Sequence, residues 1–244
     1  MKATLEVPVD SLAAALAAAP HADRLELCSD LASEGWTPDA ELVRTLRERT
    51  SCELVAMIRP RLPDGDTSLS VSGFMATPVW LQASLDQVAS MAAAGAHAVA
   101  IGLLDRAGDI DLPACETLRD AAHRLGLGVS FHRAFDLVPD RERGLHDLVA
   151  LGVRRVLTAG VQGWDTSTQT LADRTRQLEH DRHVMERAAR RRGTTPPDVI
   201  ACGGVRAANA AAWLAVTPHL HASCREGGAF NADMIRRLRA ILPA

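Results

Sequence analysis

The sequence contains no tyrosine, and Lys2 is the only lysine among its 27 lysine and arginine residues. Covalent catalysis through a Schiff base requires a desolvated lysine beside the reacting atoms. Lys2 precedes the first apolar segment, residues 4–7, so it would lie at the amino end of that strand. Parallel α/β folds place their sites at the carboxyl ends of the strands. Schiff-base aldolases are therefore a disfavoured class.

Three other features are missing. No apolar run approaches the roughly 20 residues that cross a bilayer, and the start, MKATLEVPVD, lacks the apolar segment of a signal peptide. The formal net charge of −3 lacks the basic excess of a nucleic-acid or anionic-membrane binder. The five cysteines form no C-x-x-C pair, which favours reduced thiols over a disulfide framework. The sequence therefore predicts a cytoplasmic protein whose partners are neither nucleic acid nor membrane.

Eight short apolar segments alternate with eight amphipathic helical stretches. The expected strands are residues 4–7, 24–28, 54–59, 98–103, 128–132, 155–158, 199–203 and 220–223. The expected helices are residues 9–19, 38–50, 78–94, 111–125, 140–151, 171–192, 206–216 and 231–241. Eight β-then-α units without a linker predict an α/β protein whose residues 1–244 form a single (β/α)₈ barrel domain. A doubly wound sheet is the alternative, but it usually has fewer strands.

The alternation of side chains along each strand predicts which residues point into the barrel. Apolar side chains face the surrounding helices, and the residues between them face inward. The polar residues with inward parity are Glu6, Glu26, Cys28, Arg59, Ser130, His132, Thr158, His219, His221 and Ser223. Most of them lie late in their strands, at the end of the barrel where sites are found. Any one could belong to a structural ion pair, but burying so many polar groups is costly unless they are used.

These residues are compatible with more than one chemistry. Glutamate and histidine can bind a divalent metal, or they can transfer protons as general base and acid. The turn Gly203-Gly204 offers bare backbone N–H groups that suit a phosphate or carboxylate, although tight packing explains such a turn equally well.

Copper(I) prefers thiolate and thioether ligands. Cys28 ends the second expected strand and Cys224 follows the eighth, so both lie beside the first strand of a closed barrel. Cys202 has outward parity and is expected to be a small core residue. Cys28 and Cys224 are therefore the candidate copper ligands.

Seven motifs occur in an order that is typical of one family. They are ADRLELC (22–28), EGWTP (34–38), IRPR (58–61), FHRAFD (131–136), VLTAG (156–160), GGV (203–205) and HAS (221–223). Together they resemble the CutC family over nearly the whole chain. The resemblance implies a cytoplasmic TIM-barrel protein named for copper homeostasis. One departure is that residues 62–73 replace the Phe-x-Tyr-Ser stretch that usually follows IRPR.

The family pattern falls on Glu26, Cys28, Arg59, Arg61, His132, Arg133, Asp136 and His221. We assign catalytic roles to Glu26, His132, Asp136 and His221. The expected ligand-binding residues are Glu6, Arg59, Arg61, Arg133, Thr158, Gly203, Gly204 and Ser223, with the arginines as clamps for an anion. The implied function is copper homeostasis with bound Cu(I). The alternative is a TIM-barrel enzyme of the isomerase, lyase or hydrolase type that performs acid–base catalysis on a small anionic metabolite, phosphorylated metabolites included.

Two expectations concern geometry. We expect the ring of His132 to point into the barrel mouth beside Glu26 and opposite His221, oriented by one carboxylate and open to a ligand at its other nitrogen. The alternative is that His132 simply pairs with Glu26 to close the barrel. We also expect Trp36, Trp80 and Trp164 to be exposed, and a homodimer to form through the outer helices.

Overall fold

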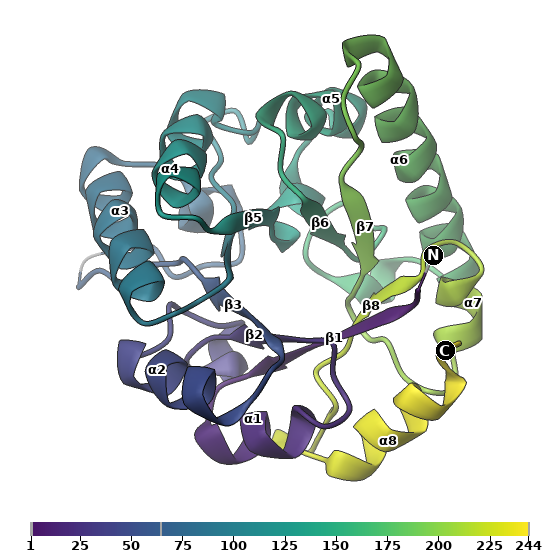
Figure 1. Ribbon diagram of the computed structural model, residues 1–244. Coiled ribbons are helices and arrows are strands. Elements are labelled where there is room, and N and C mark those ends of the chain that lie inside the picture. The colour runs from purple at the N-terminus through teal and green to yellow at the C-terminus, as the bar shows by residue number, and fades with distance from the viewer. Residues whose placement is uncertain (1, 64, 244) are drawn as a thin grey trace.

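Eight parallel strands close into a barrel in chain order, and helices surround it (Figure 1). The computed structural model describes residues 2–63 and 65–243. The barrel strands are β1 (Thr4–Val9), β2 (Arg24–Leu27), β3 (Glu53–Met57), β4 (Ala98–Ile101), β5 (Gly128–Phe131), β6 (Arg155–Thr158), β7 (Asp198–Ala201) and β8 (His219–His221). The helices are α1 (Leu12–Ala18), α2 (Ala40–Arg49), α3 (Pro78–Ala93), α4 (Leu112–Arg124), α5 (Arg141–Leu151), α6 (Leu171–Arg192), α7 (Ala210–Leu214) and α8 (Ala232–Ile241).

The predicted barrel is confirmed, with differences at the ends of elements. Val9 continues β1 instead of starting a helix, because it pairs with Leu27 of β2. The helix expected over residues 206–216 is shorter, since α7 covers only Ala210–Leu214. A short hairpin, β9 (Arg225–Glu226) and β10 (Ala229–Phe230), is inserted between β8 and α8. Among the described residues, no helix is both long and apolar enough to span a bilayer.

Local capping explains where several helices begin and end. Thr77 accepts a hydrogen bond from the backbone N–H of Trp80 at 3.2 Å and begins α3. Thr170 does the same for the N–H of Asp173 at the start of α6. Gly193 ends α6 in the left-handed region at φ 68°, a conformation that glycine adopts without steric cost.

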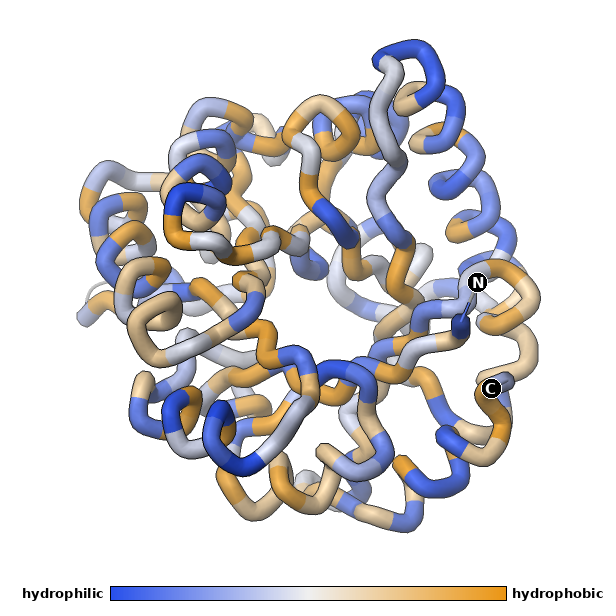
Figure 2. Tube along the Cα trace, viewed as in Figure 1, coloured by the Kyte–Doolittle hydropathy of each residue, from blue (hydrophilic) through white to orange (hydrophobic). Residues whose placement is uncertain are grey.

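The main core lies between the strands and the helices. Leu5, Val7, Leu25 and Leu27 point outward into it and are fully buried, as the alternation predicts. Figure 2 shows the same division, with hydrophobic colour concentrated where helices face the barrel and a largely hydrophilic α6. Burial of this apolar surface is the main stabilising contribution to the fold.

The parity expected for β6 and β7 is wrong. Leu157 points into the barrel, where it clusters with Ile200 and Cys202. Thr158 therefore points outward, and its hydroxyl donates to Asp136 at 2.5 Å. The cause is Arg155, whose side chain enters the barrel to pair with a glutamate and so sets the alternation of β6.

Polar contacts close the amino end of the barrel. Arg155 donates two hydrogen bonds, at 2.7 and 2.9 Å, to the carboxylate of Glu53 across the barrel. His219 contacts the hydroxyl of Thr4 at 2.8 Å and lies 3.6 Å from the carboxylate of Asp198. This polar layer forms the floor beneath the site at the other end.

Candidate active site

A cavity of about 510 Å³ lies at the carboxyl ends of the strands, the end predicted from the sequence. The expected site residues that line it are Glu26, His132, Arg133, Gly203, Gly204, His221 and Ser223. The other lining residues are Pro8, Leu31, Glu34, Met57, Leu157, Trp164, Asp165, Thr166, Cys202 and Arg225. The volume is in the range of small-molecule sites.

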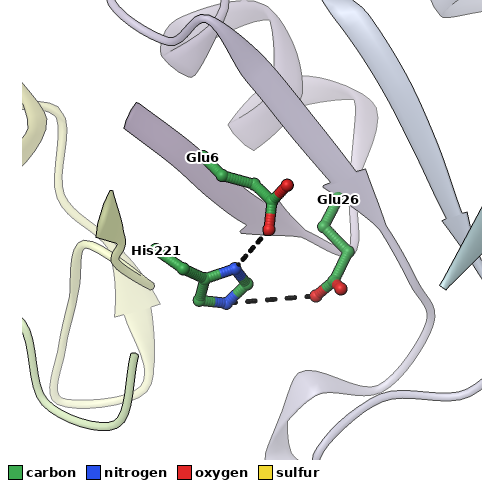
Figure 3. Close-up of side chains that lie close together, drawn as sticks. All are labelled: Glu6, Glu26 and His221. Atoms are coloured by element: carbon green, nitrogen blue, oxygen red, sulfur yellow. Dashed lines mark hydrogen bonds and ion pairs between the residues drawn. The ribbon is translucent and has the colours of Figure 1, made fainter. Parts of the chain in front are cut away.

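Three side chains from adjacent strands meet at one side of this cavity (Figure 3). Glu6 on β1 accepts a hydrogen bond from Nδ1 of His221 on β8 at 2.8 Å. The same carboxylate accepts from Nε of Arg24, at the start of β2, at 2.9 Å. Burial alone would raise the pKa of Glu6, but the bonds from His221 and Arg24 outweigh it and lower the pKa to about 2. Glu6 is therefore an anion that fixes the orientation of the His221 ring.

Glu26 on β2 differs from Glu6. It is 3% exposed, and its carboxylate makes no hydrogen bond to any described residue. The nearest charged partner is Nε2 of His221, 3.9 Å from its Oε2. Burial, followed by the opposed effects of the His221 and Glu6 charges, raises the pKa of Glu26 to about 7. A carboxyl group that opens onto a cavity and titrates near neutral pH can both accept and return a proton.

His221 lies between the two carboxylates. Burial lowers its pKa, but the hydrogen bond from its ring to Glu6 and the charge of Glu26 prevail, so the pKa is raised. With Nδ1–H held by Glu6, Nε2 is the nitrogen that faces Glu26. The sequence predicted this cluster, although it did not identify Arg24 as the residue that anchors Glu6.

His132 lies at the end of β5 and lines the cavity, as expected. Its ring is not oriented by a carboxylate, so that part of the expectation is wrong. Instead, Nδ1 accepts a hydrogen bond from the backbone N–H of Ala134 at 3.2 Å. Burial, reinforced by the positive charge of Arg59, lowers the pKa of His132 to about 3. The imidazole is therefore neutral at physiological pH.

Two arginines line the cavity, Arg133 and Arg225. Arg225 pairs with Asp10, so Arg133 is the stronger candidate for holding an anion. Its guanidinium lies over the ring of Trp164, 4.4 Å from the centroid, and donates to the Trp164 carbonyl at 2.9 Å. Nε donates to Asp136 at 3.2 Å. These contacts leave part of the planar guanidinium facing the cavity.

Asp136, expected to be catalytic, is fully buried outside the cavity lining. It accepts hydrogen bonds from Thr158 Oγ1, from the N–H of Ala159 at 2.9 Å and from Arg133. Arg141 of α5 also approaches it at 3.5 Å. Asp136 and Thr158 therefore position Arg133 from behind and do not contact a ligand in the cavity.

Arg59 and Arg61 also lie outside the cavity lining. Arg59 is 1% exposed, between the rings of Trp36 and Phe74 at 4.1 and 4.8 Å. Its guanidinium donates to backbone carbonyls of both flanking loops, including Gly35 at 3.3 Å and Thr67 at 3.3 Å. Arg61 has an exposed side chain and lies 3.7 Å from Asp30. Arg59 therefore holds two loops together, and Arg61 is a surface residue.

The model of the CutC family matches residues 3–225. The chain belongs to the CutC family. A family protein CutC from Xanthomonas campestris pv. campestris (strain B100) is 34% identical over 247 residues, which cover 98% of this chain and 97% of that protein. One from Pasteurella multocida is 39% identical over 157 residues. That match covers 64% of this chain and only 60% of the length of that relative.

Solved structures agree with the fold. A protein from Streptococcus agalactiae, named for copper homeostasis as CutC, has a TM-score of 0.75 and 22% identity. The match covers 91% of this chain and 98% of that one. Orotidine 5'-monophosphate decarboxylase from Methanocaldococcus jannaschii has a TM-score of 0.65 at 11% identity, with both chains fully covered. At these identities the likeness shows the fold alone.

The name CutC prompts the question of whether the cysteines fit copper. Cys28 is buried, points its thiol at the carbonyl of Val9 at 3.6 Å, and does not line the cavity. Cys224 is buried in the outer core, and burial raises its thiol pKa to about 11. Burial raises the pKa of Cys28 still further. Because the thiolate is the metal ligand, these two residues do not fit a Cu(I) site.

One group in the described part of the chain has ligand atoms close enough to share a metal ion. Glu6, Glu26 and His221 each offer an atom, all within 4.8 Å of one another. Oxygen and imidazole ligands suit Zn²⁺ or Cu²⁺ better than Cu(I).

Several lining residues were not identified from the sequence. The alternation of side chains predicts outward positions for Leu157 and Cys202 and makes no prediction for Met57, yet all three line the cavity. Trp164 is half-buried against Arg133. It lies in a loop after β6, where no periodic pattern predicts the direction of a side chain, so the sequence did not place it at the site.

Proposed function

We propose that this CutC-family protein is an enzyme that moves protons on a small anionic metabolite. The observation that carries the proposal is Glu26, a buried carboxyl group that lines the cavity and has no hydrogen-bond partner among the described residues. Keeping such a group costs stability, and a structural role would require a partner. A general base whose pKa lies near the working pH is the role that explains its environment.

The three clustered residues then have distinct roles. Glu26 takes a proton from the substrate and can return it. His221 lies 3.9 Å from it, stabilises the carboxylate through its charge and supplies a proton from Nε2. Glu6 holds the His221 ring by a bond of 2.8 Å, and Arg24 holds Glu6. This arrangement resembles the general pattern of a base, an acid and a residue that orients the acid.

An anionic substrate is supported by the opposite side of the cavity. Arg133 faces it with a guanidinium that is held by Asp136 and Trp164. The Gly203-Gly204 turn and Ser223 also line the cavity, and no described residue bonds to the Ser223 hydroxyl. A carboxylate or phosphate bound there would place the remainder of the molecule toward Glu26 and His221.

The test is a search for proton exchange. The protein is incubated in D₂O with mixtures of carboxylated and phosphorylated metabolites, and ¹H NMR detects exchange or conversion. We expect at least one compound to react, and Glu26→Gln to slow that reaction by roughly 10²-fold or more. Glu41→Gln, at an exposed pair on α2, is the matched control. If no compound reacts faster with the wild type than with Glu26→Gln, the proposal fails.

Metal binding is the second candidate, favoured by the shared geometry of Glu6, Glu26 and His221. The carboxylate–histidine pair is typical of residues that orient a metal ligand, and the copper-related name of the Streptococcus relative gives this candidate its interest. The expected ligands are Glu26 and Nε2 of His221. Titration with Cu²⁺ and Zn²⁺, followed by calorimetry, would show one bound ion per chain that Glu26→Gln removes.

Location and assembly stay proposals. Five free cysteines support a reducing, cytoplasmic setting. The expected homodimer depended on exposed tryptophans. Trp36 and Trp80 are buried and Trp164 lines the cavity, so these residues do not support a dimer interface. Light scattering at micromolar concentration would decide the assembly.

A further inference from the structure

His132 presents a neutral ring to the cavity in one fixed orientation. We propose that Nε2–H of His132 donates a hydrogen bond to a carbonyl oxygen of the substrate, so that Glu26 removes a proton from the carbon beside that carbonyl. This inference rests on the proposed acid–base function and adds the class of substrate, a carbonyl compound that forms an enolate.

The contact between His132 and the backbone determines the tautomer of its ring. Nδ1 of His132 lies 3.2 Å from the backbone nitrogen of Ala134, which is a donor. Nδ1 must therefore offer its lone pair, and in a neutral ring the proton is on Nε2. A metal ion at Nε2 would need the opposite tautomer, with the proton on Nδ1 facing another N–H. The backbone thus favours a donor at this position and disfavours a metal ligand.

A slot holds the ring of His132. Gly102, just beyond β4, has no side chain, and a Cβ there would lie 2.2 Å from Cε1 of His132. Phe74 covers the ring from another side, with centroids 5.4 Å apart and planes tilted by 60°. The ring is therefore confined between glycine backbone and an aromatic side chain, which fixes the direction of Nε2.

The charges around His132 decide whether its ring is protonated. No described carboxylate bonds to His132, and the charged group that acts on it is the guanidinium of Arg59. Arg59 itself is bonded to backbone carbonyls, and no carboxylate of a described residue contacts its guanidinium. The nearby positive charge disfavours an imidazolium and keeps the ring neutral. In other enzymes a neutral histidine of this kind polarises a carbonyl group.

The Nε2–H donor of His132 is unused within the described part of the chain. His132 is 5% exposed and lines the cavity, and Nε2 makes no hydrogen bond to any described residue. A nearly buried N–H donor on a residue that lines a cavity can gain its partner from a ligand there. Glu26 lines the same cavity from β2, three strands away around the barrel, so a small molecule can contact both residues.

Atoms and electrons balance in the proposed proton transfer. The carboxylate of Glu26 forms a bond to the proton, the C–H bond breaks, and its electron pair moves into the new C=C bond. The carbonyl π electrons move to oxygen, which becomes an enolate that accepts the hydrogen bond from Nε2–H of His132. Returning the proton to the same carbon completes an exchange with solvent. If that carbon carries a hydroxyl group, the hydroxyl proton moves to the enolate oxygen, the carbon-bound proton is delivered to the former carbonyl carbon, and the product is an isomer; no oxidant or other reactant is needed. Donors placed where charge develops on oxygen stabilise such transition states strongly.

The test of the donor uses the intact protein with ¹⁵N-labelled histidine. Two-bond ¹H–¹⁵N spectra, assigned with His132→Gln, should show His132 with Nδ1 unprotonated and Nε2 protonated at pH 7, and should show no imidazolium down to about pH 5. An imidazolium at pH 7, or the Nδ1–H tautomer, would overturn the inference. Either result would leave proton transfer by Glu26 standing.

The test of the contact uses oxalate, a planar anion with carbonyl-type oxygens, as the probe. We expect oxalate to shift the Nε2 resonance of His132, and His132→Phe to bind it roughly tenfold more weakly. His132→Gln, which keeps an N–H donor near the same place, should recover most of the affinity. Absence of oxalate binding to the wild type, or equal affinities for the Phe and Gln variants, would contradict the proposed contact.

Discussion

Glu6 and Glu26 show how partners decide the behaviour of the same residue type. Both are nearly fully buried, on adjacent strands. Glu6 bonds to Arg24 and His221, and its pKa is lowered to about 2. Glu26 has no hydrogen-bond partner in the described part of the chain, and burial raises its pKa to about 7. The first is a structural anion, and the second is a group that can exchange protons at neutral pH.

The raised pKa of Glu26 predicts a distinctive effect of pH on stability. Its pKa is about 7 in the folded protein, against 4.5 ordinarily. The folded state therefore binds the proton more tightly, so this residue lowers the free energy of unfolding as pH rises from about 4.5 to 7. The Glu26→Gln variant lacks this ionisable group, so its free energy of unfolding does not fall in this way as pH rises. We expect the variant to be more stable than the wild type at pH 8, by up to a few kcal/mol, and about equal at pH 5.

Urea denaturation midpoints of both proteins at pH 5 and pH 8 measure this difference. A variant that is less stable than the wild type at pH 8 would show that the Glu26 carboxylate stabilises the fold instead.

Glu6 has the opposite effect on how the free energy of unfolding changes with pH. Because its pKa is lowered, its carboxylate stabilises the fold above about pH 4.5, and that stability is lost as pH falls toward 2. Glu6→Gln leaves the buried guanidinium of Arg24 without its counter-charge. We expect a loss on the order of 3 kcal/mol, or a fall in Tm of roughly 6–12 °C at pH 7. Calorimetry with Glu41→Gln as control checks this, and equal Tm values for the two variants would refute it.

At the scale of elements, the end of β4 controls the ring at the end of β5. A Cβ on Gly102 would lie 2.2 Å from Cε1 of His132, so Gly102→Ala must displace the ring. We expect a cost of about 1–3 kcal/mol together with loss of oxalate binding. The double variant Gly102→Ala/His132→Ala should be more stable than the sum of the single effects predicts. Additive effects in thermal unfolding would mean that the two positions do not press on each other.

The strands also show where prediction from sequence reached its limit. Alternation placed Glu6 and Glu26 correctly because clear apolar neighbours, Leu5 and Leu25, flank them. It failed for β6, where Leu157 was taken as an outward residue and Thr158 as an inward one. The polar side chain of Arg155 points into the barrel there, and nothing in a four-residue strand shows that its partner lies 102 positions away along the chain.

At the scale of the whole molecule, eight β-then-α units predicted the closed barrel, and seven motifs predicted the family. The cavity could be predicted only in part. Residues that follow strands, such as Asp136 and Arg61, were assigned to the site because they belong to motifs. Whether such a residue contacts a ligand or supports one that does, as Asp136 supports Arg133, depends on tertiary contacts.

The placement of the cysteines predicts weak binding of Cu(I). Cys28 and Cys224 are buried away from the cavity, and burial raises the pKa of both thiols. We expect a Cu(I) chelator competition assay under reducing conditions to give no stoichiometric complex, and Cys28→Ser to leave the result unchanged. A tight one-to-one complex that is lost in Cys28→Ser would require these thiols to become accessible.

The titration of Glu26 tests the central claim most directly. ¹³C NMR of the glutamate side-chain carboxyl groups, recorded from pH 3 to 9 in the wild type and in Glu26→Gln, resolves each titration. We predict one carboxyl group that titrates near pH 7 in the wild type and is missing from the variant. Its absence, with every glutamate of the wild type titrating below about pH 5, would contradict the claim that this cavity is built for proton transfer.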